Sequence, residues 1–437
     1  MAKLLDVPID QMKLKAPEVL FKHDPRWLRT CRKKVARIPS GYTYLAQLLG
    51  HDMGHSLDAN LIPHVARSDR VDERKKQRVI LNDDRRRINL ISNPLTLETI
   101  YGAGPRLLGH VYDPRTLLFR LDPSARISRL MQPRTPGEWA VRALYDERNR
   151  DTLMLHELTV AWMQFHNKCA RRLLDQGQEP AQAYFAARMH VLRVWHDIIR
   201  NDVLPRFVHP DIAVLNKLDD AWKLDEITLQ HGLFRAFHAM PLEVYRLPQS
   251  GDHPLADLLK ADYAPSMAEE ERWHVDWPRF FGEGQSAVPL TGLSASSAAM
   301  LAVARLDFRT AQDVGPLRMG SREIKAAVDA LPPELAAQCR PAQLADDFAT
   351  SFPKAPHPPD EHVLTNGPLY LALLVEAQLH GEKGGFGPLG SALFRASILE
   401  AMDRVKMPEI SAPEHMLEEG EKPETMLQLI KLVRPVK

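Results

Sequence analysis

The feature that most constrains this chain is a series of long apolar segments with helical spacing and almost no alternating strand pattern. In residues 153–162 (LMLHELTVAW), apolar side chains occupy more than one face of the expected helix. Such a helix is buried among other helices, because otherwise one of its apolar faces would contact water. The segments expected to be helical are residues 42–57, 153–175, 180–201, 224–237, 293–308, 368–380 and 387–405. The pattern therefore predicts a mainly α fold with little β structure.

The domain organisation follows from how evenly the chain is composed. No internal repeat is present, no composition shift marks a linker, and the 34 prolines are spread through the chain as breaks between helices. We therefore expect one large domain over residues 38–410, preceded by an extension over residues 1–37. Residues 411–437 mix Glu, Lys and Pro, and we expect them to form a loose tail.

The charge balance argues against partners that bind through a global electrostatic field. The chain has 57 Lys and Arg against 56 Asp and Glu, so neither nucleic acid nor an anionic membrane is an expected partner. No apolar run reaches the ~20 residues of a membrane span, and the first residues lack the apolar core of a signal peptide. Three widely spaced cysteines fit reduced thiols. We expect a soluble, cytoplasmic protein; its oligomeric state is not indicated.

The first candidate for chemistry is residues 41–55 (GYTYLAQLLGHDMGH), which place His51 and His55 four residues apart on one helix face. That geometry can bind zinc, and the pattern differs from the metalloprotease His-Glu-x-x-His only by the shorter carboxylate of Asp52. A zinc-dependent hydrolase that uses these three residues is one candidate function. The alternative is a helix whose histidines only satisfy buried hydrogen bonds.

The same segment resembles the distal helix of the animal haem peroxidase family, which reads Gly-Tyr-Thr-Tyr-x-x-Gln-x-x-x-His-Asp. Later segments resemble the family in the same order, with Tyr-Gly-x-Gly-Pro, an arginine motif, Trp-His, an Arg-x-x-His motif and Asp-Trp-x-x-Phe-Phe. The resemblance covers roughly residues 38–405 and is closest to the bacterial peroxinectin-like branch of the peroxidase–cyclooxygenase superfamily. It implies a single helical haem peroxidase domain that contains haem b.

The resemblance assigns Gln47, His51 and Arg148 to the distal, catalytic side of the haem. Gln47 would orient water or a small anion, and His51 would move a peroxide proton from one oxygen to the other. Arg148, in the segment YDERNRD, would stabilise negative charge on the departing oxygen, because a guanidinium stays protonated at any working pH.

On the proximal side, the segment LFRAFHAM resembles the family's Tyr-Arg-Phe-Gly-His-Ser and assigns His238 as the axial ligand of the haem iron. Arg235, one turn earlier, would pair with a haem propionate. Asp151 stands for a family glutamate that can form an ester with the haem. Gly50 replaces the aspartate that forms the second ester, so at most one ester link is expected.

Two further departures concern the surroundings of the haem. In the family's calcium-binding loop, two aspartates read Thr96 and Glu98 here, which leaves Asp52 and Glu98 as anionic ligands. Calcium prefers several hard oxygens, so a plain loop is favoured over a calcium site. In the family, an asparagine accepts a hydrogen bond from the proximal histidine. In this chain the corresponding position is Leu306, or Asp307 if the register shifts by one residue.

Together these segments imply a haem-dependent peroxidase that oxidises a small organic or halide substrate, or a biosynthetic intermediate. Its partners would be hydrogen peroxide and a small-molecule reductant. Fatty-acid oxygenation through a tyrosyl radical is not expected, because Arg235 occupies the position of the radical-forming tyrosine. A haem-binding relative without turnover and the zinc hydrolase stay open as alternatives.

Overall fold

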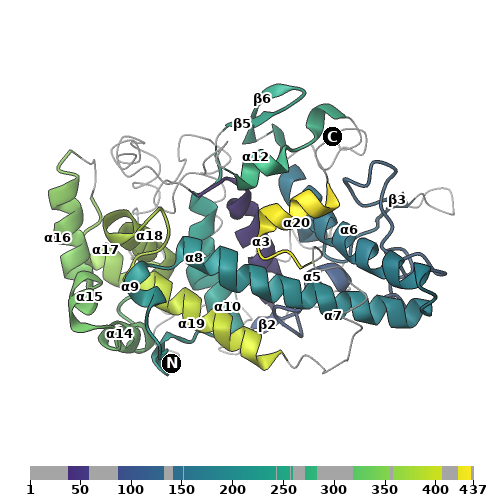
Figure 1. Ribbon diagram of the computed structural model, residues 1–437. Coiled ribbons are helices and arrows are strands. Elements are labelled where there is room, and N and C mark those ends of the chain that lie inside the picture. The colour runs from purple at the N-terminus through teal and green to yellow at the C-terminus, as the bar shows by residue number, and fades with distance from the viewer. Residues whose placement is uncertain are drawn as a thin grey trace, which may run out of the picture.

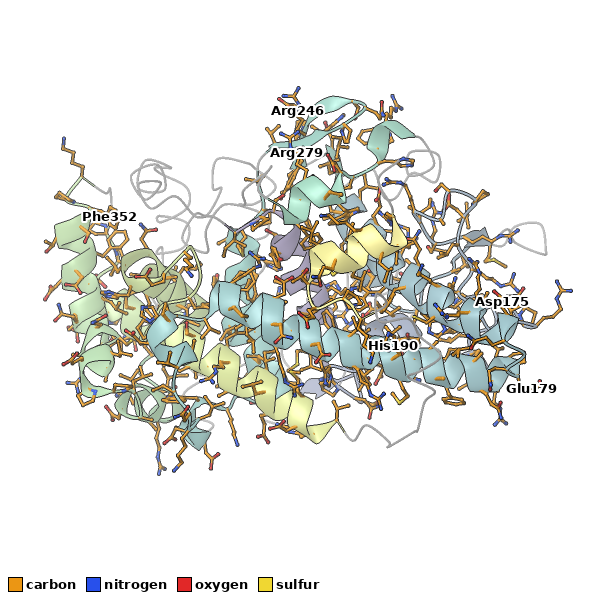
Figure 2. All side chains as sticks on the ribbon, viewed as in Figure 1. Asp175, Glu179, His190, Arg246, Arg279 and Phe352 are labelled. Carbon is orange, nitrogen blue, oxygen red and sulfur yellow. The ribbon has the colours of Figure 1, made fainter. Side chains whose placement is uncertain are left out.

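The two longest helices of the described residues pack against each other. The computed structural model describes residues 38–58, 87–131, 141–150, 152–242, 244–255, 257–258, 271–282, 318–354, 358–405 and 422–434. Helix α6 (Leu153–Asp175) and helix α7 (Pro180–Ile198) lie side by side in Figure 1, joined by a short turn. Figure 2 shows Asp175 and Glu179 at this turn, at one end of the molecule, and Phe352 at the other end.

The remaining helices are mostly short. They are α3 (Gly41–Met53), α5 (Glu98–Tyr101), α8 (Leu204–Phe207), α9 (Pro210–Ala213), α10 (Glu226–Thr228), α12 (Trp277–Phe281), α14 (Arg322–Asp329), α15 (Pro333–Gln338), α16 (Pro341–Ser351), α17 (Glu361–Asn366), α18 (Leu369–His380), α19 (Pro388–Arg404) and α20 (Met426–Val433). The 3-10 turns are η3 (Glu147–Arg150), η5 (Asp220–Trp222), η7 (Phe234–Ala239) and η8 (Glu271–Trp273), and the π turns are η4 (Ile199–Val203) and η6 (Leu229–Leu233).

Strands form only three antiparallel pairs among the described residues. They are β1 (Ser56–Asp58) with β2 (Arg87–Asn89), β3 (Leu130–Met131) with β4 (Val141–Arg142), and β5 (Val244–Leu247) with β6 (Gly251–Pro254). In the third pair Tyr245 lies opposite His253. The predicted mainly α fold with little β structure is confirmed.

Helix α6 shows why the long apolar segments fold as they do. The side chain of Thr152 accepts a hydrogen bond from the backbone N–H of Leu155, which caps the start of the helix. Most of its residues are buried on several faces, among them Met154 and Trp162. The helix packs against α3, α7 and α20, so the expectation of a helix buried among other helices is met.

Two expected helices differ from the observed elements. The segment 224–237 is divided into α10, η6 and η7 rather than forming one helix. Gly232 has a low helix propensity, and it packs against α18, where a Cβ at this position would lie in ordinary van der Waals contact with Leu369, 3.4 Å from Cδ2. Helix α3 ends at Met53 because Gly54 is extended and the chain enters β1. The expected helix 293–308 lies outside the described residues.

The expectation of a loose tail was wrong for residues 422–434. They contain α20, whose Met426, Leu429 and Ile430 are fully buried. These side chains recur at helical spacing, and a capping box between Thr425 and Gln428 starts the helix. The domain boundaries at residues 37 and 410 stay predictions. Within the described ranges, no helix is long and apolar enough to cross a membrane.

A buried ion cluster fixes α20 to the core. Glu157 of α6 accepts hydrogen bonds from Arg434, which follows α20, from Arg126 and from the indole N–H of Trp277 in α12. Burial alone would raise the pKa of Glu157, but the two guanidinium groups outweigh it and hold the pKa below its usual value. The cluster joins four parts of the chain that are distant in sequence.

We expect Arg434→Ala to lower the free energy of unfolding by about 3 kcal/mol, because the buried Glu157 carboxylate loses one of its two cationic partners. Urea denaturation of the full chain measures this change. Arg404→Ala is the control: its ion pair with Glu226 is largely exposed, and its loss should cost less than about 1 kcal/mol. Equal effects of the two substitutions would contradict the assignment.

Candidate functional site

Helix α3 presents two of the predicted distal residues on one accessible face. Every residue of α3 is buried except Gln47 and His51. Residues four apart lie on the same side of an α-helix, so the two side chains share one face. The helix begins at Gly41, where a Cβ would lie 2.9 Å from the ring of Phe281 in α12, which requires glycine at this contact. Close packing at its start and the burial of its other faces orient α3.

The electrostatic surroundings of His51 keep its ring neutral. The residue as a whole is partly exposed, but protein surrounds the imidazole. Desolvation and, after it, the positive charge of Arg148 lower its pKa to about 3, with a smaller contribution from His238 and against the opposing effects of Asp146 and Asn149. A neutral imidazole can accept a proton at physiological pH, so His51 is available as a base.

Arg148 is fixed at the C-terminal end of α3. Its guanidinium forms an ion pair of 2.6 Å with Asp146. It also donates to the backbone carbonyls of His51, at 3.2 Å, and Gly54, at 2.8 Å. A positive charge is favourable here, because the carbonyls at a helix C-terminus carry partial negative charge. Burial would raise the pKa of Asp146, but Arg148 holds that pKa below its usual value.

The proximal residues lie on η7, which packs against α3. Within η7, only Arg235 and His238 are not buried, and residues three apart in a 3-10 helix lie one above the other. Arg235 lies 3.4 Å from Nδ1 of His231. Because His238 is close enough to lower the pKa of His51, the structure brings the predicted proximal and distal histidines to a common region.

Gly50 lies where α3 meets the proximal segment. A Cβ at Gly50 would lie 3.2 Å from Cδ1 of Phe234, the residue before Arg235. A larger side chain would have to displace this ring, so close packing accounts for the glycine. Asp151, the predicted ester residue, and the positions Leu306 and Asp307 lie outside the described residues.

The two carboxylates predicted as calcium ligands have different partners. Asp52 is fully buried and accepts hydrogen bonds from the backbone of Leu97, at 2.9 Å, and from the indole N–H of Trp195, at 3.2 Å. Burial raises its pKa to about 7, because these donors offset desolvation only in part. Glu98 instead accepts from the backbone of Ser92 and from Asn93. These contacts argue against a calcium ion shared by Asp52 and Glu98.

The loop that Asp52 holds is strained. Leu95 and Leu97 are buried and have φ angles of 60° and 54°, a left-handed conformation that costs a non-glycine residue about 1 kcal/mol or more. The backbone N–H of Leu95 donates to the carbonyl of Asp52, and His196 hydrogen-bonds to the carbonyl of Leu95. Hydrogen bonds from α3 and α7 thus stabilise the loop.

The zinc alternative receives no support from the geometry. The Asp52 carboxylate accepts a hydrogen bond from the backbone N–H of Leu97, and Nδ1 of His51 is hydrogen-bonded to Asn149. No group of three His, Cys, Asp or Glu side chains in the described ranges is arranged to hold a metal ion. His55 contributes its backbone N–H to Asn89 at the end of α3.

Sequence reasoning missed two residues that contact the predicted site, Asn149 and Asp146. Asn149 is fully buried, and its Oδ1 lies 2.9 Å from Nδ1 of His51. Asp146 is the partner of Arg148. Both lie within the segment that carries the predicted arginine. The sequence signal that could have found them is that the motif resembled by this segment has Asp and Asn at the same positions. The contact itself could not be foreseen, since the partner His51 comes from a helix 98 residues away.

No protein-family model matches the chain, and no curated protein matches its sequence. Its structure is similar to that of peroxidase A from Dictyostelium discoideum, with a TM-score of 0.56 and 11% identity over 94% of this chain and 88% of that chain. The fatty acid alpha-dioxygenase of Arabidopsis thaliana gives a TM-score of 0.49 and 13% identity over 95% of this chain and 75% of that chain. The chain therefore shares the mainly α fold of peroxidase A. The bacterial peroxinectin-like branch stays a prediction.

We expect the stability of the full chain to be independent of calcium. A calcium site present only in the folded state would add about 2.7 kcal/mol at a calcium concentration 100 times its Kd. Since Asp52 is satisfied by N–H donors, thermal unfolding in 1 mM calcium and in excess chelator should give the same midpoint. A midpoint that rises with calcium would show that the loop binds calcium and would contradict this expectation.

Proposed function

We propose that this chain is a haem-dependent oxidoreductase of the peroxidase type that uses hydrogen peroxide to oxidise a small organic or halide substrate. The observation that carries the proposal is the pairing of two accessible faces on packed elements. Gln47 and His51 are the only residues of α3 that are not buried, and Arg235 and His238 are the only such residues of η7. The fold, which is that of a known peroxidase, supports the same class of activity.

The residues on these faces suit haem b in their chemistry. His238 would supply the axial imidazole, and the guanidinium of Arg235 suits a propionate. Gly50 cannot form an ester, so a covalent link would depend on Asp151. When bound, the haem would supply the iron-centred oxidation chemistry that amino-acid side chains lack. The protein would then position the peroxide and control the proton.

His51 is the residue that would move the proton. Its pKa of about 3 leaves the ring neutral at physiological pH, so one ring nitrogen can accept a proton from hydrogen peroxide. The imidazolium formed in this way can return the proton to the outer oxygen, which leaves as water. Unlike its neighbours on α3, His51 is not fully buried, as contact with a small reactant requires.

Arg148 and Gln47 would act on charge and orientation. Because the guanidinium of Arg148 is already held by Asp146 and two carbonyls, its charge is preorganised near His51. A fixed positive charge stabilises negative charge that develops on the departing oxygen without a costly rearrangement. Gln47, one helical turn from His51, offers an amide that can orient peroxide, water or a small anion.

Stopped-flow mixing of the haem-loaded chain with hydrogen peroxide tests the proposal. We expect His51→Ala to slow the change in the haem spectrum at least about 100-fold, because general acid–base catalysis is lost. His55→Ala is the matched control, since the backbone N–H of His55, rather than its ring, bonds to Asn89, and its rate should stay close to wild type.

Two results would contradict the proposal. If haem binds at full occupancy but wild-type protein does not react with peroxide, the chain is a haem-binding relative without turnover. If zinc rather than haem is retained and both histidine variants lose it, the two histidines form a metal site instead.

A further inference from the structure

A chain of hydrogen bonds leads from Arg148 to the ring of His51. It passes through the Asp146 carboxylate, the Thr99 hydroxyl and the Asn149 side-chain amide. Asp146, Thr99 and Asn149 are buried, at 7%, 1% and 0% exposure, so water has little access to substitute for a missing partner. The proton positions in the chain can therefore be assigned one group at a time.

Asp146 fixes the hydroxyl proton of Thr99. Paired with Arg148, Asp146 is a carboxylate and can only accept hydrogen bonds. Oγ1 of Thr99 lies 2.9 Å from Oδ2 of Asp146 and 3.3 Å from Oδ1 of Asn149. Because the carboxylate is both nearer and charged, the single hydroxyl proton points to Asp146. The oxygen of Thr99 then acts as an acceptor toward Asn149.

Thr99 in turn fixes the orientation of the Asn149 amide. Nδ2 of Asn149 lies 3.0 Å from the backbone carbonyl oxygen of Thr99 and 3.1 Å from its Oγ1. Both atoms accept, so the amide nitrogen must face them. The amide oxygen therefore faces His51, where Oδ1 lies 2.9 Å from Nδ1. The reversed amide would place two acceptors against each other at Thr99.

The last step concerns the imidazole itself. An amide oxygen can only accept a hydrogen bond, so Nδ1 of His51 must carry the proton that it donates to Asn149. A neutral imidazole has a single N–H, which leaves Nε2 with its lone pair. In the other tautomer, the two acceptors would oppose each other at 2.9 Å, and Nε2 would present an N–H instead of a base.

We propose that Asn149, oriented by Thr99, is a positioning residue that holds His51 as the Nδ1-protonated tautomer and keeps Nε2 available as the base. The tautomer is a property of this chain alone. Its role in moving the peroxide proton rests on the proposed function. In that reaction Nε2 takes the proton and later releases it, while the proton on Nδ1 stays in its hydrogen bond to Asn149.

Nitrogen NMR of the full chain with 15N-labelled histidine tests the assignment. The chain is measured without haem and again with diamagnetic zinc protoporphyrin, and the His51 signals are identified by their loss in His51→Gln. We expect Nδ1 of His51 to show the shift and directly bonded proton of a protonated nitrogen, and Nε2 to show the shift of an unprotonated one. A proton on Nε2 in the wild-type chain would overturn the proposal.

Two substitutions at position 149 separate positioning from a merely structural role. In Asn149→Ala, the ring should lose its preference for the Nδ1-protonated form, and the reaction of the haem-loaded chain with peroxide should slow about 10- to 100-fold. Asn149→Asp keeps an acceptor oxygen and should restore both the tautomer and most of the rate. Its carboxylate should also raise the pKa of His51, because it stabilises the imidazolium.

The outcomes are distinguishable from a failure of the proposed function. An unchanged tautomer in Asn149→Ala would overturn the positioning role, and so would a slow Asn149→Asp variant that keeps the tautomer. If Asn149→Ala does not fold, the wild-type tautomer and the Asp variant decide. Absence of any peroxide reaction, with the Nδ1-protonated ring observed, would refute the peroxidase and leave the tautomer assignment standing. Asn366→Ala, in a side chain that bonds to His362 of α17, controls for general effects of losing an amide.

Discussion

The geometry of the candidate site depends on the ion pair between Arg148 and Asp146. These residues are two positions apart in the chain, yet the guanidinium reaches across to the carbonyls of His51 and Gly54. One interaction therefore closes the η3 turn, satisfies backbone acceptors at the end of α3 and places a positive charge beside the imidazole. The same carboxylate orients Thr99, so the ion pair influences His51 both through its charge and through hydrogen bonds.

A second set of contacts stabilises the other side of α3. The Asp52 carboxylate bonds to the strained loop at Leu97 and to Trp195 of α7. Since Asp52 follows His51 directly, its burial also limits how α3 can rotate. The two faces of α3 therefore differ in their contacts. One face contacts the loop at Leu97 and α7, and the other presents Gln47 and His51.

The longest helices could be predicted from sequence, because burial of apolar faces decides where long helices form, whereas the shorter helices α14 to α17 were not among the expected segments. The bounds of α6 agree with the expected helix over residues 153–175, and α18 and α19 agree within a residue. The segment 224–237 was predicted as one helix but is divided into α10, η6 and η7; it contains Gly232, which has a low helix propensity, and its η6 and η7 parts pack against α18. In α20 the apolar stripe was present in the sequence, but the surrounding Glu, Lys and Pro masked it.

The predicted site residues were recognisable because they lie in ordered motifs, whereas the contacts made by their supporting partners were not. Asn149 contacts His51 only because η3 folds against α3, and Asp52 differs from a calcium ligand only in where its carboxylate points. Such relations depend on side-chain direction, which a motif does not encode. The sequence thus indicates which residues form the candidate site, and the fold decides which side chains form hydrogen bonds to them.

Titration of the full chain with haem, followed by its absorption spectrum, tests most directly whether His238 and His51 occupy opposite sides of one haem site. We predict that the wild-type chain binds one haem. The variant His238→Ala should lose tight haem binding and recover it when imidazole is added as a replacement ligand. His51→Ala should bind haem as wild type does, because His51 is a base rather than a ligand. Unchanged haem binding in His238→Ala, or loss of haem binding in His51→Ala, would contradict the assignment of His238 as the ligand and His51 as the base.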